Sequence, residues 1–128
     1  MSQANVERVR AGIEAYNRGD IEALIGTYDP DVVFETLLLG THVGREAVRL
    51  LYDENRRNLS GYRLDPEEVI DAGDKVISVV RLGGAGPASQ IATGDQIAFL
   101  ATFEDDLVVR QQTFRNKEEA LAAAELGE

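Results

Sequence analysis

The chain has 128 residues and a formal net charge of −10, with 44% hydrophobic and 28% charged residues. This length suits one domain with its own core, and the composition is that of a globular protein. The acidity argues against a nucleic-acid partner, since such proteins use clustered Lys and Arg to contact phosphates. The chain holds no cysteine, which excludes disulfides, thiolate catalysis and cysteine-based metal sites within it.

Targeting and membrane signals are also missing from the sequence. No apolar run approaches the ~18 residues that a membrane-spanning helix needs, so we predict no membrane partner. The N-terminal residues 1–5 lack the basic and then apolar pattern of a secretory signal. Together with the absence of cysteine, these features predict a cytoplasmic protein.

The first third of the chain has helical patterns. Apolar residues recur at helical spacing over residues 6–16, and Gly19 ends this helix because glycine takes the left-handed conformation at little cost. Asp20 predicts the N-cap of a second, shorter helix, which Pro30 ends. A third helix opens at Gly44 and carries an apolar face.

Strand patterns dominate the rest. The predicted strands cover residues 32–37, 62–70, 75–82, 96–103 and 107–114, and a final helix covers residues 117–126. Asn116 and Glu119 form a variant capping box for that final helix. The element order predicts an α+β domain in which helices pack on one face of a curved antiparallel sheet.

The last two strands form a hairpin joined at Asp105 and Asp106. Because strand side chains alternate between faces, we predict which residues share one face of this hairpin. They are Ile97, Phe99, Phe103, Val108, Arg110, Gln112 and Phe114. A mostly apolar face with two polar groups is typical of a core or of the wall of a small-molecule pocket.

Five short sequence words occur in a fixed order along the chain. They are AYNRGD (15–20), DPDV (29–32), GREAVR (44–49), IDAGDKV (70–76) and RNKEEAL (115–121). In this order and spacing the chain resembles the SnoaL-like branch of the nuclear transport factor 2-like superfamily. The resemblance implies one domain over residues 1–128, with a cone-shaped fold whose sheet wraps around the N-terminal helices, a short C-terminal helix and a deep pocket.

The resemblance also indicates where enzymes of this superfamily place their polar groups. The general base of ketosteroid isomerases matches Thr36, their protonated acid matches near Phe99, and their oxyanion tyrosine matches near Gly12. SnoaL-like relatives of unknown activity often carry a histidine or another polar group near Phe99 and a glutamate near Gln112. None of these positions is ionisable here, which argues against steroid isomerisation.

Two residues remain as catalytic candidates, His42 and Glu35. His42 is the only histidine and lies in the predicted loop between Gly40 and Gly44, at the pocket mouth. A single histidine is more often a surface or loop residue, so catalysis is the alternative interpretation. The carboxylates form no cluster with metal-ligand spacing, and we expect no metal and no cofactor.

We predict that the protein binds a small, mainly apolar molecule. The predicted ligand contacts are Tyr16, Tyr28, Phe34, Thr36, Tyr52, Phe99, Gln112 and Phe114. The alternative for the aromatic residues is that they fill the core. The alternative functions are a polyketide- or terpenoid-directed cyclase, isomerase or hydrolase, and a pocketless interaction module. The resemblance also implies a homodimer, for which Ala98, Leu100 and Thr102 offer a small flat surface.

Overall fold

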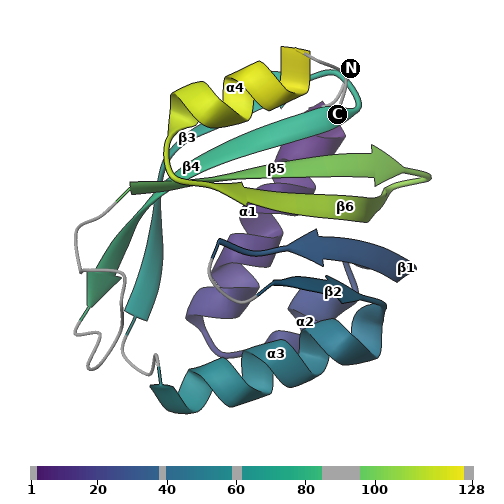
Figure 1. Cartoon of the computed structure of the whole chain (residues 1–128), viewed down its shortest axis with the longest axis vertical. Helices are drawn as coiled ribbons and strands as arrows, with labels where there is room; N and C mark the ends of the chain where they lie inside the picture. The colour runs from purple at the N-terminus through teal and green to yellow at the C-terminus, as the bar shows by residue number, and fades with distance from the viewer. Residues whose placement is uncertain (1–2, 38–39, 59–61, 85–95, 126–128) are drawn as a thin grey trace.

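The computed structural model describes residues 3–37, 40–58, 62–84 and 96–125 (Figure 1). In chain order the elements are α1 (Gln3–Asn17), α2 (Ile21–Ile25), β1 (Tyr28–Glu35), β2 (Thr41–Val43), α3 (Arg45–Asn58), β3 (Tyr62–Ala72), β4 (Lys75–Gly84), β5 (Gln96–Glu104), β6 (Leu107–Phe114) and α4 (Lys117–Glu125). The strands form a six-stranded sheet in the order β2-β1-β6-β5-β4-β3. Neighbouring strands are antiparallel except β1 and β6, which are parallel. The predicted α+β class is confirmed, with a mixed sheet.

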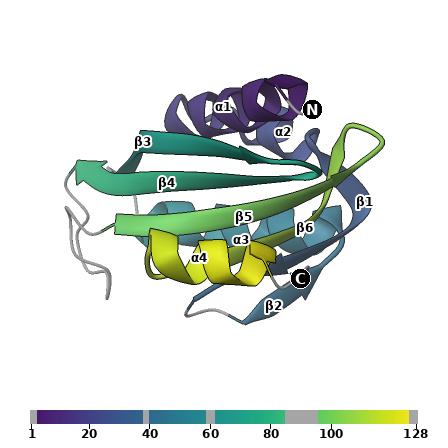
Figure 2. The same ribbon diagram turned by 90° about the horizontal axis from the view of Figure 1, so that it is seen from above.

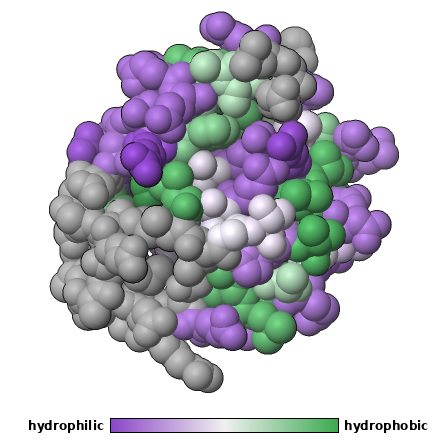
Figure 3. Space-filling view, viewed as in Figure 1, coloured by the Kyte–Doolittle hydropathy of each residue, from purple (hydrophilic) through white to green (hydrophobic). Residues whose placement is uncertain are grey.

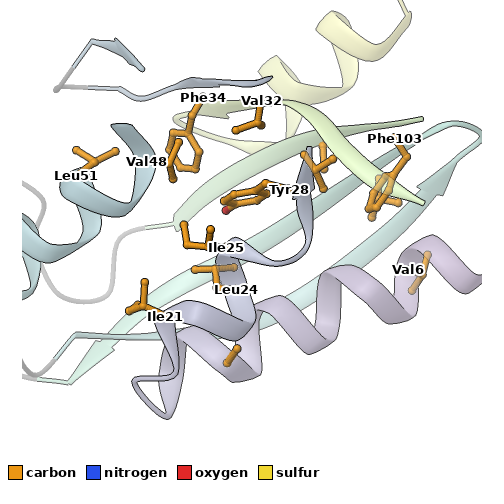
Figure 4. Close-up of a cluster of buried hydrophobic side chains, with 14 residues drawn as sticks. Val6, Ile21, Leu24, Ile25, Tyr28, Val32, Phe34, Val48, Leu51 and Phe103 are labelled. Atoms are coloured by element: carbon orange, nitrogen blue, oxygen red, sulfur yellow. The ribbon is translucent and has the colours of Figure 1, made fainter. Parts of the chain in front are cut away.

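The sheet separates two layers of helices (Figures 1 and 2). Its inner face packs against α1, α2 and α3, and its outer face packs against α4. The inner core contains Val6, Ala15, Ile21, Leu24, Ile25, Tyr28, Val32, Phe34, Val48, Leu51, Val76, Ala101, Phe103 and Val108 (Figure 4). The prediction that all helices share one face is therefore wrong for α4.

Local signals set the helix ends as the sequence predicts. Gly19, just after α1, has a φ of +81°, which glycine adopts without strain. The Asp20 carboxylate accepts a hydrogen bond of 3.1 Å from the Ala23 N–H at the start of α2. Before α4, the Asn116 side chain accepts a hydrogen bond of 2.9 Å from the Glu119 N–H. These caps satisfy backbone donors that a helix start leaves without an intrahelical partner.

The first two strands differ from the prediction. β1 begins at Tyr28, ahead of Pro30, whereas the sequence pattern predicts a strand only from residue 32. The register between β1 and β6 shifts between Tyr28 and Val33, so Pro30 lies in an irregular stretch, where strands tolerate proline. Residues 41–43, predicted to lie in a loop, form the short strand β2, which pairs with the end of β1.

One β-bulge decides which side chains of β6 face inward. Thr102 pairs with Arg110, but the next pair joins Phe103 to Val108, so Val109 is an extra residue in β6. A bulge of one residue reverses the faces of every side chain beyond it. Val108 belongs to the inner core, whereas Phe114 packs in the outer cluster beneath α4.

The bulge overturns part of the predicted hairpin face. Ile97, Phe99 and Phe103 do share the inner face of β5. Arg110, Gln112 and Phe114 lie on the outer face instead, because they follow the bulge. The prediction that these three residues share a face with Val108 is wrong.

The outer face of β5 is covered by the chain itself. Ala98 and Leu100 of β5 pack in one cluster with Ala120 of α4, and each of the three is 0% exposed. Ala98 and Leu100 therefore do not form the exposed flat surface expected for a homodimer. On the face shown in Figure 3, apolar residues lie in small groups between hydrophilic ones among the coloured atoms. The homodimer stays a prediction.

Candidate functional site

The inner layer has two distinct ends. At one end lie the two turns that join β3 to β4 and β5 to β6, and there Arg8 of α1 is 3.5 Å from Asp106. At the other end, α1 and β6 finish and β5 begins. There the Asn17 side chain exchanges two hydrogen bonds of 2.9 Å with the backbone of Leu64 in β3. We call this second region the Asn17 end.

Solvent reaches part of the inner face of the sheet towards the Asn17 end. Near the turns, the inward side chains of β4, β5 and β6 are buried, as at Phe103 and Val108. Towards the Asn17 end, Val80, Leu82 and Ile97 are buried as well. The inward side chains Phe99, Gln111 and Thr113 are only partly buried. A partly exposed side chain on an inward face is one that solvent or a ligand can contact, so this region is the candidate ligand site.

Four aromatic rings connect the core to this region. The Tyr28 and Phe34 rings lie 6.0 Å apart, and the Phe34 and Tyr52 rings lie 5.9 Å apart, both edge to face. The Tyr16 ring is 5.9 Å from the Tyr52 ring. Tyr28 and Phe34 are buried among side chains of α2, α3 and β1, so they belong to the core (Figure 4). Tyr16 and Tyr52 are partly buried and can line the site.

The hydroxyl groups of Tyr28 and Tyr52 form a pair with 3.2 Å between the two oxygens. Burial raises the pKa of Tyr28 to about 12, even though the hydrogen bond to Tyr52 acts in the opposite direction. Burial also raises the pKa of Tyr52 well above its ordinary value, and the neighbouring Tyr28 adds to this effect. Both tyrosines are therefore neutral at physiological pH, and the pair places no charge beside the site.

Gln111 and Thr113 are the polar groups that the sequence reasoning missed. Gln111 is in register with Ala101 of β5 and with Phe34 of β1, and Thr113 is in register with Phe99. These three partners belong to or pack against the inner clusters, so both polar side chains point inward. No described residue forms a side-chain hydrogen bond with either of them. The bulge brings these two side chains to the inner face, and the adjacent apolar residues Val108 and Val109 leave the alternation of faces ambiguous at that point.

Gln112 and Phe114 lie outside this site, contrary to the prediction. Gln112 is 8% exposed on the outer face, and its Oε1 has no hydrogen-bond partner among the described residues. Phe114 packs with the cluster beneath α4. The bulge is the physical reason for both corrections. Ligand contact at Tyr16, Tyr52 and Phe99 remains a prediction.

The two catalytic candidates lie on opposite sides of the sheet. Glu35 is in register with Gln112 on the outer face. Its carboxylate accepts a hydrogen bond of 2.8 Å from Nε of Arg110 and forms an ion pair with Nη2 of the same residue. It is therefore not an inner-face base. His42 is in register with Phe34, which places it on the inner side of β2, partly buried.

The positions that match ketosteroid isomerase groups are used differently here. The Thr36 hydroxyl donates a hydrogen bond of 2.7 Å to the Gly40 carbonyl and so helps to close the turn after β1. A Cβ at Gly12 would lie 3.3 Å from Cδ1 of Leu24, so the approach of α2 leaves little room for a larger side chain. Phe99 supplies an aromatic ring on the inner face.

The inner face at the Asn17 end carries no formal charge on its central strands. The inward positions of β4, β5 and β6 in this region are Ser78, Val80, Leu82, Ile97, Phe99, Ala101, Gln111 and Thr113. Within the described ranges, no cluster of three or more His, Asp or Glu side chains is placed to hold a metal ion. None of the described helices is long and apolar enough to cross a membrane.

Comparisons with known proteins agree with this architecture. A candidate polyketide cyclase from Sinorhizobium meliloti is 24% identical with a TM-score of 0.73, over 84% of this chain and 94% of that chain. TerC, crystallised with polyporic acid, is 23% identical with a TM-score of 0.75, over 95% and 96% of the two chains. A protein from Catenulispora acidiphila with a ketosteroid isomerase-like fold, in complex with trimethylamine, is 20% identical with a TM-score of 0.75, over 91% and 90%.

Identities below 25% show the fold alone, and a search of curated protein sequences finds no significant match. The model of the SnoaL-like domain matches residues 9–120. That match covers most of the chain. It includes α2, α3 and all six strands of the described structure in full, and parts of α1 and α4. The chain therefore belongs to the SnoaL-like domain family.

Proposed function

We propose that the protein binds a small, mainly apolar and uncharged molecule against the inner face of the sheet at the Asn17 end. The observation that carries this proposal is the placement of Gln111 and Thr113. Both are partly buried polar side chains on an inward surface that is otherwise apolar except for the buried Ser78, and neither side chain has a hydrogen-bond partner in the described part of the chain.

The energetics of this surface favour a ligand with few polar groups. Water can solvate these two partly exposed groups in the free protein, so a ligand that replaces this water with a hydrogen-bond partner gains roughly 0.5–1.5 kcal/mol per group. Phe99, Tyr16 and Tyr52 add aromatic surface that an apolar ring can contact. A charged ligand would lose hydration without meeting an opposite charge on the central strands. TerC and the Catenulispora acidiphila protein, which share this fold, were each crystallised with a small molecule.

The test is a thermal-shift screen of neutral aromatic and terpenoid compounds, combined with native mass spectrometry of protein purified from its own host. We expect at least one neutral compound to raise the melting temperature, since it binds the folded state only. The variant Thr113→Trp should lose this stabilisation because the indole fills the inner face beside Phe99. The matched variant Phe114→Trp changes the next residue, which lies on the outer face, and should still be stabilised by the compound.

Two outcomes would contradict the proposal. One is a screen without any stabiliser together with a mass spectrum without any co-purified molecule, which would favour the pocketless interaction module. The other is equal loss of stabilisation in Thr113→Trp and Phe114→Trp, which would move the binding site away from the inner face.

A second candidate function is acid–base catalysis by His42 on the bound molecule. His42 lies beside Phe34 on the inner side of β2, and imidazole is suited to proton transfer near neutral pH. A co-purified molecule that is converted by wild-type protein but only bound by His42→Gln would favour this enzyme. If His42→Gln converts the molecule as fast as the wild type does, His42 is not the catalytic group and this second function is excluded.

A further inference from the structure

The register of β6 also indicates which groups the ligand presents to the protein, an inference that rests on the proposed function. We infer that the site has a two-point polar specificity set by Gln111 and Thr113. The preferred ligand is then a neutral, flat ring system with oxygen-bearing groups at two separated positions, lying along β6 so that one group meets each side chain.

The spacing of the two side chains is fixed by the strand. Residues two apart in a strand point to the same face and lie roughly 7 Å apart. The bulge at Val109 precedes both residues, and the pairing beyond it is regular, with Gln111 opposite Ala101 and Thr113 opposite Phe99. Both polar groups therefore lie on β6, a strand that pairs with β5, rather than on a loop. This pairing keeps the distance between the two groups constant.

The neighbours of the two side chains define the shape of the ligand. Beside Gln111, Ala101 of β5 and Phe34 of β1 are both buried in the inner core, so a ligand can meet only the exposed part of the Gln111 side chain. Beside Thr113, the partly buried Phe99 offers an aromatic ring. A flat ring can lie on this surface between the two polar groups, whereas a bulky group would meet Phe99.

The chemistry of the two side chains defines the ligand's functional groups. The glutamine amide and the threonine hydroxyl can each donate and accept a hydrogen bond, so each can bind a hydroxyl or a carbonyl group. Neither can neutralise a carboxylate, and the central strands offer no cation on this face. The two-point pattern thus separates neutral oxygenated rings both from hydrocarbons and from acids.

The inference is tested by calorimetric titration with four related probes: naphthalene, 2-naphthol, 2,6-dihydroxynaphthalene and 2-naphthoate. Each hydroxyl that finds a partner is expected to increase affinity by about five- to tenfold. The affinity should therefore rise from naphthalene to 2-naphthol and again to 2,6-dihydroxynaphthalene. The carboxylate of 2-naphthoate should abolish the gain.

Variants assign the gain to particular residues. Gln111→Leu and Thr113→Val should each remove the advantage of 2,6-dihydroxynaphthalene over 2-naphthol, while naphthalene, which forms no hydrogen bond, should bind at least as tightly as to the wild type. Gln112→Leu is the matched control on the outer face and should leave the whole series unchanged. Equal affinity for the three neutral probes, or an unchanged series in both inner-face variants, would overturn the two-point inference and leave the proposed function standing. If no probe binds and the thermal-shift screen also finds no stabilising compound, the two-point inference and the proposed function are both wrong.

Discussion

Raising the pH from 10 to 12 is expected to lower the free energy of unfolding by about 2 kcal/mol through Tyr28 alone, since two pKa units correspond to roughly 2.7 kcal/mol and the rest is lost outside this pH range. Burial raises the pKa of Tyr28 from 10.0 to about 12. An unfolded chain therefore releases this proton near pH 10, whereas the folded protein keeps it until about pH 12. The stability is fully present below pH 10 and is lost as the pH rises through the folded pKa. The raised pKa of Tyr52 adds to the loss in the same direction.

This loss can be measured by urea unfolding at pH 10, 11 and 12, with tyrosinate absorbance recorded on the same samples. The absorbance of the buried tyrosines should rise together with unfolding rather than before it. Tyr28→Phe is the control, because it removes one titrating group and should flatten the pH dependence. A stability that is constant between pH 10 and pH 12 would contradict the burial of the hydroxyl pair.

Placing a carboxylate beneath α4 is the second change with a large expected effect. Ala120 is 0% exposed and packs in the outer cluster with Ala98 and Leu100. Ala120→Asp would bury a charge with no partner in that cluster, or force α4 off the sheet and expose its apolar face. We expect the free energy of unfolding to fall by about 2–4 kcal/mol, as for other buried unpaired polar groups.

Ala122→Asp is the matched control for this prediction. Ala122 lies two residues further along the same helix and is exposed, so its variant should stay within about 0.5 kcal/mol of the wild type. Urea unfolding of the two variants under one condition makes the comparison. Equal stability of both variants would mean that α4 does not pack on the outer face as described.

The order and type of most elements could be predicted because their signals are local. Gly19, Asp20 and the Asn116–Glu119 pair mark helix ends through contacts within a few residues. Alternation along residues 97–103 also assigned the inner face of β5 correctly. These features depend on backbone preferences and side-chain period, which the sequence displays directly.

The faces of β6 could not be predicted by alternation alone. Val108 and Val109 are both apolar and β-branched, so either could continue the pattern, and only pairing with β5 shows that Val109 is extra. Because of this single extra residue, Gln111 faces inward and Gln112 faces outward, the reverse of the prediction. A one-residue change in register is invisible in a hydrophobic pattern but reverses which side chains reach a ligand.

Non-local contacts explain the other differences. Glu35 and Arg110 are 75 residues apart and meet only because β1 and β6 pair in parallel. The alanine-rich stripe of α4 predicts that the helix is buried on one side, but not which face of the sheet it covers. The predicted aromatic contacts likewise divide into core residues such as Tyr28 and partly buried residues such as Tyr52, a division set by tertiary packing.

The most direct test of the inner-face site uses the adjacent glutamines as reporters of opposite faces. In a two-dimensional nuclear magnetic resonance spectrum, the side-chain amides of Gln111 and Gln112 can be followed while 2,6-dihydroxynaphthalene, or the best neutral stabiliser from the screen, is added. A ligand on the inner face should shift the Gln111 amide and the Thr113 and Phe99 signals, and leave the Gln112 amide unchanged. Shifts confined to Gln112, Phe114 and α4 would place the ligand on the outer face and contradict the account.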